Sequence, residues 1–569
     1  MKRIISLLLC LCLLAGAFSA SAAAIGSTVS FTVATEAGSN AYQKALLTLE
    51  DWLFALNERF RGALRGLRLL PQEEPPFPKA RVTAKTLWLL DRPEGDAALA
   101  LGSLQGVLAN CSETQLLFRD GAYRQYLEYA DADVIEMSGP EAQPDALLKA
   151  FADRLNGYVL CDGTGAQAAV SVAGVLQAVV IPEGLQSAAE AAGLACLEDV
   201  RGWTDHTLRR SRYFCRLSRT VAFSQPVSYA PKLVDYAVMA GAYFGFSDSE
   251  DQTACKMTYA FLRDNAVVFG WNPALGEYET VSSLSPLNAC LIAADHACNV
   301  SVLSGFPSAD LKQALTPEPA AQTPHHTVCL FMSDGDNLQW IVTAFNNASH
   351  FGSPLRGKFP VAWGLPASLN AAVPTMAKWL YANAAPGDEY ILQISGLGYT
   401  FPSKWTNPFA LRRMYGSLSE QMAKADLHVA AVLDDGGFNH RSLDVLAGQE
   451  SVDGVFYLDY SDYAGMKGAA RLSHGKPIVG AKYKLWYGQP GGSPEEIAAA
   501  VNAASTDPSD PDAYSLIVIH AWSGLDEAGS FAGYGDTMAA VDRMVAAFGP
   551  DVRLVAPSAF ITQLTDALS

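Results

Sequence analysis

The stretch TVCLFMSDGDN (Thr327–Asn337) opens the most regular part of this sequence, and two similar stretches follow it. They are FPVAWGLP (Phe359–Pro366) and YILQISGLGYTFPSKW (Tyr390–Trp405). In each stretch an apolar run ends in a cluster of polar, glycine and aromatic residues. An apolar run that lies between helical segments is typical of a buried parallel strand. Because ligands of α/β proteins bind where such strands end at their carboxyl side, these clusters predict a functional site.

The same alternation of strand and helix continues to the end of the chain. Helical stretches separate most of the strands, and SPEEIAAAVNAAS (Ser493–Ser505) has the Ser, Pro and Glu pattern of a helix start. Seven or eight βα units therefore predict a (β/α)7–8 barrel over residues 325–569. The eight predicted strands are Thr327–Met332, Phe359–Trp363, Tyr390–Ser395, His428–Leu433, Gly454–Leu458, Pro477–Lys482, Tyr514–His520 and Arg553–Ala556.

The upstream part of the chain divides into smaller α/β segments. With 569 residues, the chain is too long for a single core. Mixed helix and strand patterns predict small α/β subdomains over residues 25–153, 154–228 and 229–315. The Pro-rich TPEPAAQTP at residues 316–324 lacks an apolar period and predicts a linker to the barrel.

The first 22 residues have the pattern of a secretory signal peptide. Lys2 and Arg3 form the charged region, Ile4–Phe18 the apolar region, and Ala20–Ala22 the small-residue cleavage site. The mature protein is therefore expected to be secreted or extracytoplasmic. No later run is long and apolar enough to cross a bilayer, so we expect no stable membrane insertion after cleavage.

The composition narrows the classes of ligand. The formal net charge of −18 disfavours nucleic acid and anionic membrane surfaces as partners, and suits neutral or cationic ligands. Aromatic residues make up 10% of the chain, which agrees with stacking on sugar rings and equally with packing in a core. The eight cysteines that follow the signal permit disulfides in an exported protein, and buried free thiols are an alternative for those inside apolar runs.

Two of the opening stretches resemble a known family. MSDGDNLQW (Met332–Trp340) and SGLGYTFP (Ser395–Pro402), with the upstream DVRGW (Asp199–Trp203), are similar to the GxGYxYP family of secreted bacterial proteins. Phe401 stands where the family name has Tyr, which removes a hydroxyl and keeps the ring. The resemblance covers nearly the whole mature chain. It implies a glycoside hydrolase whose C-terminal domain is a barrel of the glycoside hydrolase/deacetylase type.

Asp334 and Asp336 are the first predicted catalytic residues. Glycoside hydrolysis needs two carboxyl groups flanking the bond, about 5 Å apart for retention and roughly 6.5–9.5 Å apart for inversion. Gly335 lets the backbone approach a ligand closely, and Asn337 is predicted to bind a sugar hydroxyl. Two alternatives stay open: the carboxylates could cap the following helix, or they could hold a divalent cation. We expect no other cofactor and no resident metal.

Later strand ends supply further carboxylates. Asp434 is predicted to be a third catalytic residue, because it and Asp435 repel each other and one would keep its proton if both were buried. Asp435 and Asp459 are predicted to contact substrate. A solvated turn is the alternative for each of them. A further acidic pair, Asp526 and Glu527, follows the seventh predicted strand.

Aromatic and histidine side chains are predicted to complete a sugar-binding mouth, since they fall at or just past strand ends. Each has a structural alternative: core packing for a single Trp, an anchored loop for Tyr399 and a hydrogen-bonded structural role for His520. These predicted substrate-binding residues are Trp363, Tyr399, Trp405, Trp486, His520 and Trp522.

The sequence therefore predicts an exported glycoside hydrolase that acts on a poly- or oligosaccharide. A metal-dependent carbohydrate deacetylase is an alternative, although no two of the nine histidines are four residues apart as in the usual zinc pair. A non-catalytic glycan-binding protein is a second alternative. The chain lacks GxSxG, GxGxxG and Walker motifs, which disfavours nucleophilic hydrolases and nucleotide-binding proteins.

Overall fold

The computed structural model describes residues 53–64, 75–226, 232–246, 258–315, 324–523 and 535–569. The chain divides into two compact units, Met1–Glu73 and Glu74–Ser569. In the first unit residues 53–64 are helical. The predicted signal peptide, nearly all of the predicted linker, and the pair Asp526 and Glu527 lie outside the described residues.

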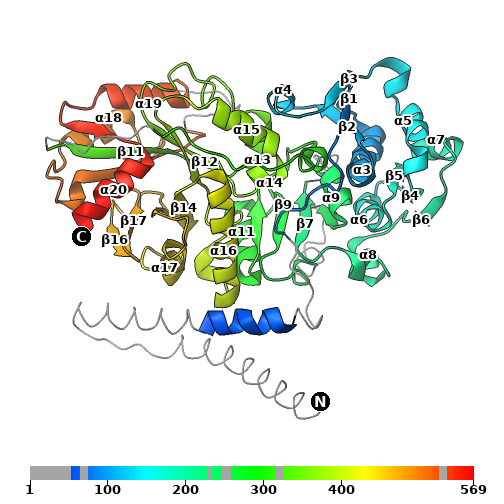
Figure 1. Ribbon diagram of the computed structural model, residues 1–569, viewed down its shortest axis with the longest axis horizontal. Coiled ribbons are helices and arrows are strands. Elements are labelled where there is room, and N and C mark those ends of the chain that lie inside the picture. Colours follow the sequence, from blue (N-terminus) through cyan, green and yellow to red (C-terminus); the bar gives the residue numbers. More distant parts are fainter. Residues whose placement is uncertain (1–52, 65–74, 227–231, 247–257, 316–323, 524–534) are drawn as a thin grey trace, which may run out of the picture. The chain divides into compact units, whose positions relative to one another are not determined.

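One curled, mostly parallel sheet forms the C-terminal region of the second unit (Figure 1). Its strand order is β16-β17-β15-β14-β13-β12-β11-β19-β18, with β20 paired to β11, and only β16 runs antiparallel to its neighbour. The strands are β11 (His326–Met332), β12 (Val361–Leu365), β13 (Asp388–Leu392), β14 (Val429–Asp434), β15 (Gly454–Asp459), β16 (Ala470–Ser473), β17 (Lys476–Gly480), β18 (Tyr483–Leu485), β19 (Tyr514–Ile519) and β20 (Val552–Leu554).

β17 and β18 are close in the sequence, yet they lie near opposite ends of this strand order. β17 pairs with β15, and after two intervening residues β18 pairs with β19. The amide of Ala481 donates to the carbonyl of Tyr457 in β15 at 3.0 Å, and the amide of Lys482 donates to that of Leu516 in β19 at 2.8 Å. The sheet is therefore curled so strongly that β15 and β19 both accept hydrogen bonds from the residues between β17 and β18. In the described part of the chain no ladder pairs β17 with β18, so the pairing does not show the complete barrel that the sequence predicts.

Helices connect these strands and follow the predicted alternation. The predicted start of α18 is confirmed, because Ser493 and Glu496 form a capping box there. Asn407 and Asp536 cap α16 and α19 with side-chain oxygens. The helices are α13 (Leu338–Thr343), α14 (Leu369–Ala372), α15 (Pro374–Ala382), α16 (Pro408–Ala425), α17 (Arg441–Ala447), α18 (Pro494–Asn502), α19 (Thr537–Ala546) and α20 (Pro557–Leu568).

Three smaller parallel sheets precede the curled sheet, with strand orders β2-β1-β3, β5-β4-β6 and β10-β9-β7-β8. β7 precedes the predicted boundary at residue 228 and pairs with β8 and β9 of the third sheet. The strands are β1 (Thr86–Asp91), β2 (Thr114–Arg119), β3 (Asp133–Glu136), β4 (Tyr158–Cys161), β5 (Val179–Pro182), β6 (Cys196–Asp199), β7 (Val221–Gln225), β8 (Tyr243–Phe246), β9 (Val267–Gly270) and β10 (Cys290–Ile292).

Helices cover these small sheets and bury mainly small and aliphatic side chains. The longest of them, α3, packs on α9 and β5. The helices are α3 (Gly95–Cys111), α4 (Tyr123–Leu127), α5 (Pro144–Ala150), α6 (Ala166–Leu176), α7 (Gln186–Ala191), α8 (Asp205–Arg210), α9 (Val234–Ala240), α11 (Gly276–Leu284) and α12 (Val300–Leu303).

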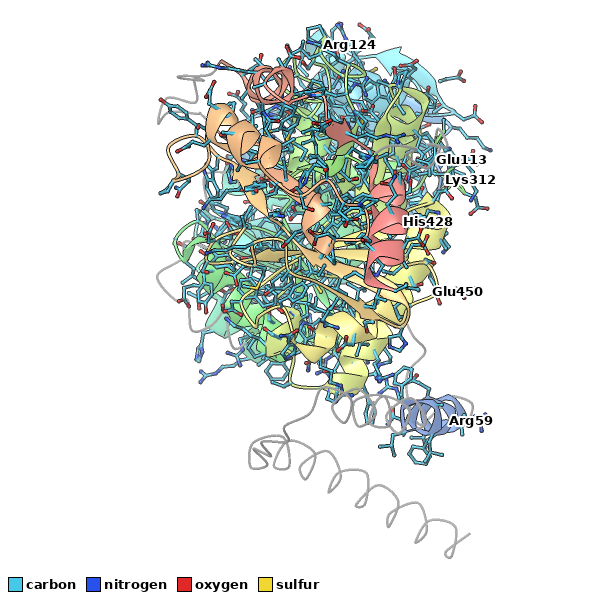
Figure 2. All side chains as sticks on the ribbon, turned by 90° about the vertical axis from the view of Figure 1, so that its left-hand side faces the viewer. Arg59, Glu113, Arg124, Lys312, His428 and Glu450 are labelled. Atoms are coloured by element: carbon cyan, nitrogen blue, oxygen red, sulfur yellow. The ribbon has the colours of Figure 1, made fainter. Side chains whose placement is uncertain are left out.

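The interior of the second unit is apolar, and charged side chains such as Lys312 and Glu450 lie at its surface (Figure 2). Cys161 and Cys290 are among the free thiols of the described residues, and both are buried. This confirms the free-thiol alternative for cysteines inside apolar runs. No helix of the described residues is long and apolar enough to cross a membrane.

Candidate active site

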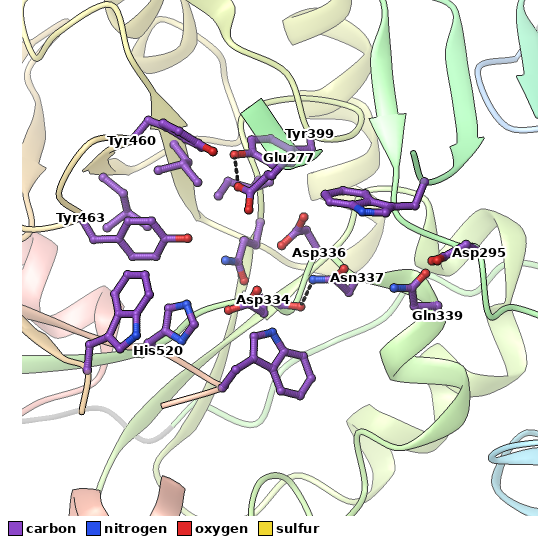
Figure 3. A pocket seen from close by; sticks show the side chains of 17 residues that line it. Glu277, Asp295, Asp334, Asp336, Asn337, Gln339, Tyr399, Tyr460, Tyr463 and His520 are labelled. Atoms are coloured by element: carbon purple, nitrogen blue, oxygen red, sulfur yellow. Dashed lines mark hydrogen bonds between the residues drawn. The ribbon is translucent and has the colours of Figure 1, made fainter. Parts of the chain in front are cut away.

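A cavity of about 600 Å³ lies at the carboxyl ends of the curled sheet's strands (Figure 3). Its lining comes from the ends of β14 and β15 and from the segments that follow β11, β13, β15, β18 and β19. Three more lining residues, Trp271, Glu277 and Asp295, come from the region of the third small sheet. The upstream part of the unit therefore forms one wall of the cavity.

The segment after β11 places Asp334 and Asp336 in this cavity. Gly335 passes so close to β12 that a Cβ atom there would lie 1.9 Å from the carbonyl oxygen of Gly364. Its amide donates to Oε1 of Gln393 at 2.8 Å, which fixes the turn. Asp334 has φ of +64°, a left-handed conformation that Asp tolerates better than most residues. Only glycine between the two aspartates allows this path.

Neither aspartate caps the helix that follows. α13 begins at Leu338 after Asn337, and no side-chain hydrogen bond caps its N-terminus. The Asp334 carboxylate instead accepts from the hydroxyl of Ser333. The amide of Asn337 donates to the backbone carbonyl of Asp334 at 3.0 Å and lines the cavity beside it. The helix-cap alternative for these carboxylates is therefore wrong, and their oxygens face the cavity.

The Asp336 carboxyl holds its proton at neutral pH. Burial raises its pKa to about 8, and the negative charges of Asp334 and Glu277 add to the rise. A carboxyl with a raised pKa beside charged carboxylates is the arrangement that supplies a general acid.

Glu277 is one of two lining carboxylates that sequence analysis did not select; Asp295 is the other. It lies on α11, and its Oε1 accepts from the hydroxyl of Tyr399 at 2.6 Å. Burial and the charge of Asp334 raise the Glu277 pKa, while the Tyr399 hydrogen bond opposes the rise. Figure 3 shows the side chains of Glu277, Asp334 and Asp336 directed into one space. Glu277 follows β9 of the third small sheet rather than a strand of the predicted barrel, so the barrel's strand-end pattern does not point to it.

The GLGYTFP stretch joins the curled sheet to the third small sheet. The amides of Leu291 and Tyr399 each donate to the other's carbonyl, at 2.8 and 2.7 Å, as an isolated antiparallel bridge beside β10. A Cβ atom on Gly398 would lie 2.5 Å from the carbonyl oxygen of Leu291. The glycine is therefore needed for this contact, which also brings the hydroxyl of Tyr399 to Glu277.

Family models match most of the second unit. Residues 324–565 match the "GxGYxYP putative glycoside hydrolase C-terminal domain", residues 218–305 the "GxGYxYP third domain" and residues 155–217 the "GxGYxYP_N second domain". The chain belongs to the GxGYxYP family.

A crystal structure described as a "putative hydrolase" from Bacteroides thetaiotaomicron is similar to this GxGYxYP family member. The TM-score is 0.76 at 23% sequence identity, over 88% of this chain and 98% of that chain. This likeness shows a shared fold. No curated protein matches the chain.

The family's second aromatic position is Phe401 in this chain. Its ring is fully buried and packs against the rings of Tyr278, Tyr399 and Tyr460. The amide of Phe401 donates to the hydroxyl of Ser285 at 2.9 Å. The ring of Phe401 therefore packs in the core of this stretch, and no hydroxyl is present at this position.

One end of the cavity is aromatic and contains three of the predicted residues. Trp486 and His520 stack with ring centroids 3.8 Å apart and planes 15° apart, and Trp522 lies beside them in the lining. Tyr463 packs against both stacked rings, at 5.4 and 5.9 Å. Burial lowers the pKa of His520, although the charge of Asp334 opposes this, so the imidazole is neutral at neutral pH. A neutral stacked pair offers a flat surface for a sugar ring.

Asp434 and Asp435 lie outside the lining residues. Asp434 is 0% exposed, and its carboxylate accepts from the amide and hydroxyl of Ser403 at 3.1 and 2.7 Å. It therefore holds the end of the GLGYTFP stretch rather than a substrate, which corrects the prediction that it is catalytic. Asp435 is exposed, forms an ion pair with Lys404 at 2.7 Å and accepts from the hydroxyl of Tyr278 at 2.8 Å. Its carboxylate is committed to these partners.

Three other predicted substrate-binding residues also lie outside the lining. Trp363 is within β12 at 0% exposure, and its indole N–H donates to Asp388 at 2.8 Å. The indole N–H of Trp405 donates to the hydroxyl of Thr400 at 2.8 Å, so it braces the GLGYTFP stretch from inside. Asp459 ends β15 and accepts from the amide of Ser461 at 3.0 Å, as in a turn.

The cavity has no preformed metal cluster in the part of the chain that the structure describes, since no group of three or more His, Cys, Asp or Glu side chains there is arranged to hold an ion. Four carboxylates line the cavity, and the two nearest in sequence, Asp334 and Asp336, are only a pair. A divalent cation at these two residues stays a prediction.

Proposed function

We propose that this protein is an exported glycoside hydrolase that cleaves poly- or oligosaccharides in the cavity at the carboxyl ends of the curled sheet. The observation that carries this proposal is that Asp336, whose pKa burial raises to about 8, lies beside Asp334 in a cavity with a stacked aromatic wall. Membership of a family described by its C-terminal glycoside hydrolase domain supports the same reaction class.

In this proposal Asp336 is the general acid. It gives its proton to the glycosidic oxygen as the bond to the anomeric carbon breaks, and the leaving sugar departs as an alcohol. Asp334 acts on the anomeric carbon, either by attacking it directly or by taking a proton from an attacking water. Water supplies the new hydroxyl in both cases and releases one proton. After direct attack by Asp334, the Asp336 carboxylate takes this proton from the water that cleaves the sugar–Asp334 ester; where Asp334 itself deprotonates the water, the proton passes from Asp334 to Asp336 through solvent. Glu277, held by Tyr399, stabilises the positive charge that develops on the sugar ring.

We also infer that the curled sheet functions as a barrel of the glycoside hydrolase/deacetylase type. In such a barrel the segment from β17 to β18 takes one strand position between β15 and β19. The hydrogen bonds from Ala481 to β15 and from Lys482 to β19 support this arrangement. In this arrangement the segments that follow β11 and β18 surround the same opening of the barrel.

Export rests on the signal pattern of residues 1–22. Expression of the full chain in a secreting bacterial host, followed by mass spectrometry of the protein's N-terminus, tests it. A mature N-terminus close to residue 23 outside the cytoplasm supports export. An intact Met1 in the cytoplasm contradicts it.

The activity is tested by measuring the release of reducing sugar from a panel of glycans by the mature chain and by its Asp334→Asn and Asp336→Asn variants. Hydrolysis by the wild type that both substitutions abolish supports the proposal. Acetate release that a chelator stops would replace it by a metal-dependent deacetylase. Glycan binding without turnover, unchanged in both variants, would replace it by a binding function.

A further inference from the structure

The side chain of Gln393 is held in the cavity wall by the ends of three neighbouring strands. It follows β13, is 2% exposed and lines the cavity. Its Oε1 accepts from the amide of Gly335, after β11, at 2.8 Å. Its own backbone amide donates to the carbonyl of Leu365, the last residue of β12, at 2.9 Å. These contacts fix the side chain beside the turn that contains Asp334 and Asp336.

Two glycines make the space that this side chain occupies. A Cβ atom on Gly364, in β12, would lie 1.9 Å from Oε1 of Gln393. A Cβ atom on Gly335 would lie 1.9 Å from the carbonyl oxygen of Gly364, so the amide that holds Oε1 also depends on a glycine. Glycine in a strand often marks the close approach of another group. Here two of them allow one amide to reach the carboxyl ends of the strands.

The contact with Gly335 decides which atom of the Gln393 amide is left for a ligand. A backbone N–H is a donor, so the side-chain atom that faces it must be the oxygen. Nε2 makes no hydrogen bond within the described part of the chain, and it is not sealed in the interior as Nδ1 of His520 is. An otherwise buried side chain therefore offers N–H donors to the cavity.

The other side-chain amides of the lining are already engaged. Asn337 donates to the backbone carbonyl of Asp334 at 3.0 Å, and Gln339 hydrogen-bonds to the carboxyl of Asp295. Ionised carboxylates only accept hydrogen bonds, whereas a sugar hydroxyl both donates and accepts. The carboxylates of the cavity can satisfy the donor of such a hydroxyl. Nε2 of Gln393 can satisfy its acceptor.

We propose that Nε2 of Gln393 binds the hydroxyl on carbon 2 of the sugar unit whose bond is cleaved. This inference rests on the proposed hydrolase function. Cleavage between Asp334 and Asp336 places the anomeric carbon at the turn that Gln393 holds, and the 2-hydroxyl is the hydroxyl nearest to that carbon. Hydrogen bonds to this hydroxyl strengthen in the transition state. The substrate is therefore a glycan whose cleaved unit has a free 2-hydroxyl, rather than a 2-deoxy or 2-acetamido sugar.

The test combines substitution of Gln393 with removal of the 2-hydroxyl. The probes are 4-nitrophenyl glycosides of the oligosaccharide that the glycan panel shows to be cleaved, with and without the 2-hydroxyl on the unit that carries the nitrophenyl group. Gln393→Ala removes the whole amide. Gln393→Glu keeps an oxygen for the amide of Gly335 and places an acceptor where the hydroxyl needs a donor, so it serves if the alanine variant does not fold.

The expected result is a selective loss on the probe that has the 2-hydroxyl. In each variant kcat/KM should fall about fivefold or more further on this probe than on the 2-deoxy probe, because one hydrogen bond is lost. A role that only supports the turn would lower both values by the same factor. Gln143→Ala changes an exposed residue before α5 and is the matched control, which should leave both values unchanged.

The outcomes separate this inference from the proposed function. Equal falls on both probes, or cleavage only of glycans whose cleaved unit carries a 2-acetamido group, would overturn the contact while hydrolysis stands. If no glycan is cleaved, the hydrolase proposal fails, and calorimetry with methyl α- and β-glucosides and their 2-deoxy forms decides the contact alone. Tighter binding of a glucoside than of its 2-deoxy form that is lost in Gln393→Glu supports it. Absence of this difference, or its retention in the variant, overturns it.

Discussion

Burial, together with the charges of Asp334 and Glu277, raises the pKa of Asp336 to about 8. Asp336→Asn keeps the size of the side chain and removes its proton-donating ability. We expect a 10²–10⁴-fold fall in kcat on an active glycan, the usual contribution of a general acid. Activity of the wild type should also fall as pH rises through about 8, because Asp336 loses its proton there. If the residual activity of the Asp336→Asn variant still fell as pH rose through about 8, Asp336 would not be the group that titrates there.

The raised pKa of Asp336 also affects stability. Its folded pKa, about 8, lies above the ordinary value of 3.8, so the folded state holds a proton that the unfolded state has released between these values. The wild type should therefore lose stability as pH rises from about 4 to about 8. Asp336→Asn removes this loss and should be more stable than the wild type at pH 9 by about 1–3 kcal/mol. Urea unfolding of both proteins across this pH range measures the difference, and parallel curves would contradict it.

At the scale of structural elements, the GLGYTFP stretch is a connector as well as part of the lining. Gly398→Ala would place a methyl group 2.5 Å from the carbonyl oxygen of Leu291. We expect about 1–3 kcal/mol lower stability from this overpacking, together with a lower kcat because the contact between Tyr399 and Glu277 shifts. Thermal unfolding and steady-state kinetics measure both effects.

Gly416→Ala is the matched control for that substitution. Gly416 lies inside α16, and a Cβ atom there would meet nothing within 4 Å. Alanine should raise stability by about 0.5–1 kcal/mol because it restricts the unfolded chain and favours the helix. If both glycine substitutions changed stability in the same direction, the contact between Gly398 and Leu291 would not be the cause.

At the scale of the whole second unit, the upstream region supplies part of the cavity wall, including Glu277. Glu277→Gln should lower kcat by roughly 10–100-fold with little change in KM, because it weakens the stabilisation of developing charge. Glu279→Gln changes an exposed residue on the same helix and should leave kcat unchanged. Equal kinetics for the two variants would show that the upstream region only supports the fold.

The sequence by itself determined the alternation of strands and helices, the family, and the segments that reach the cavity. These features depend on local patterns: apolar runs that end in polar turns, the Ser493 capping box, and glycines next to functional residues. For this reason Asp334, Asp336, Asn337, Tyr399, Trp486, His520 and Trp522 are found in the lining, as strand-end positions predict.

Only the tertiary structure decided which strand-end residues share one space. Asp434 and Trp363 also sit on predicted strand tips, yet their side chains bond to Ser403 and Asp388 inside the fold. Glu277 and Asp295 have no strand-end signal of the curled sheet, and they reach the cavity because the bridge between Leu291 and Tyr399 joins two sheets distant in sequence. Local patterns place a residue at the end of an element, whereas the direction and partner of its side chain depend on contacts that form only when the chain is folded.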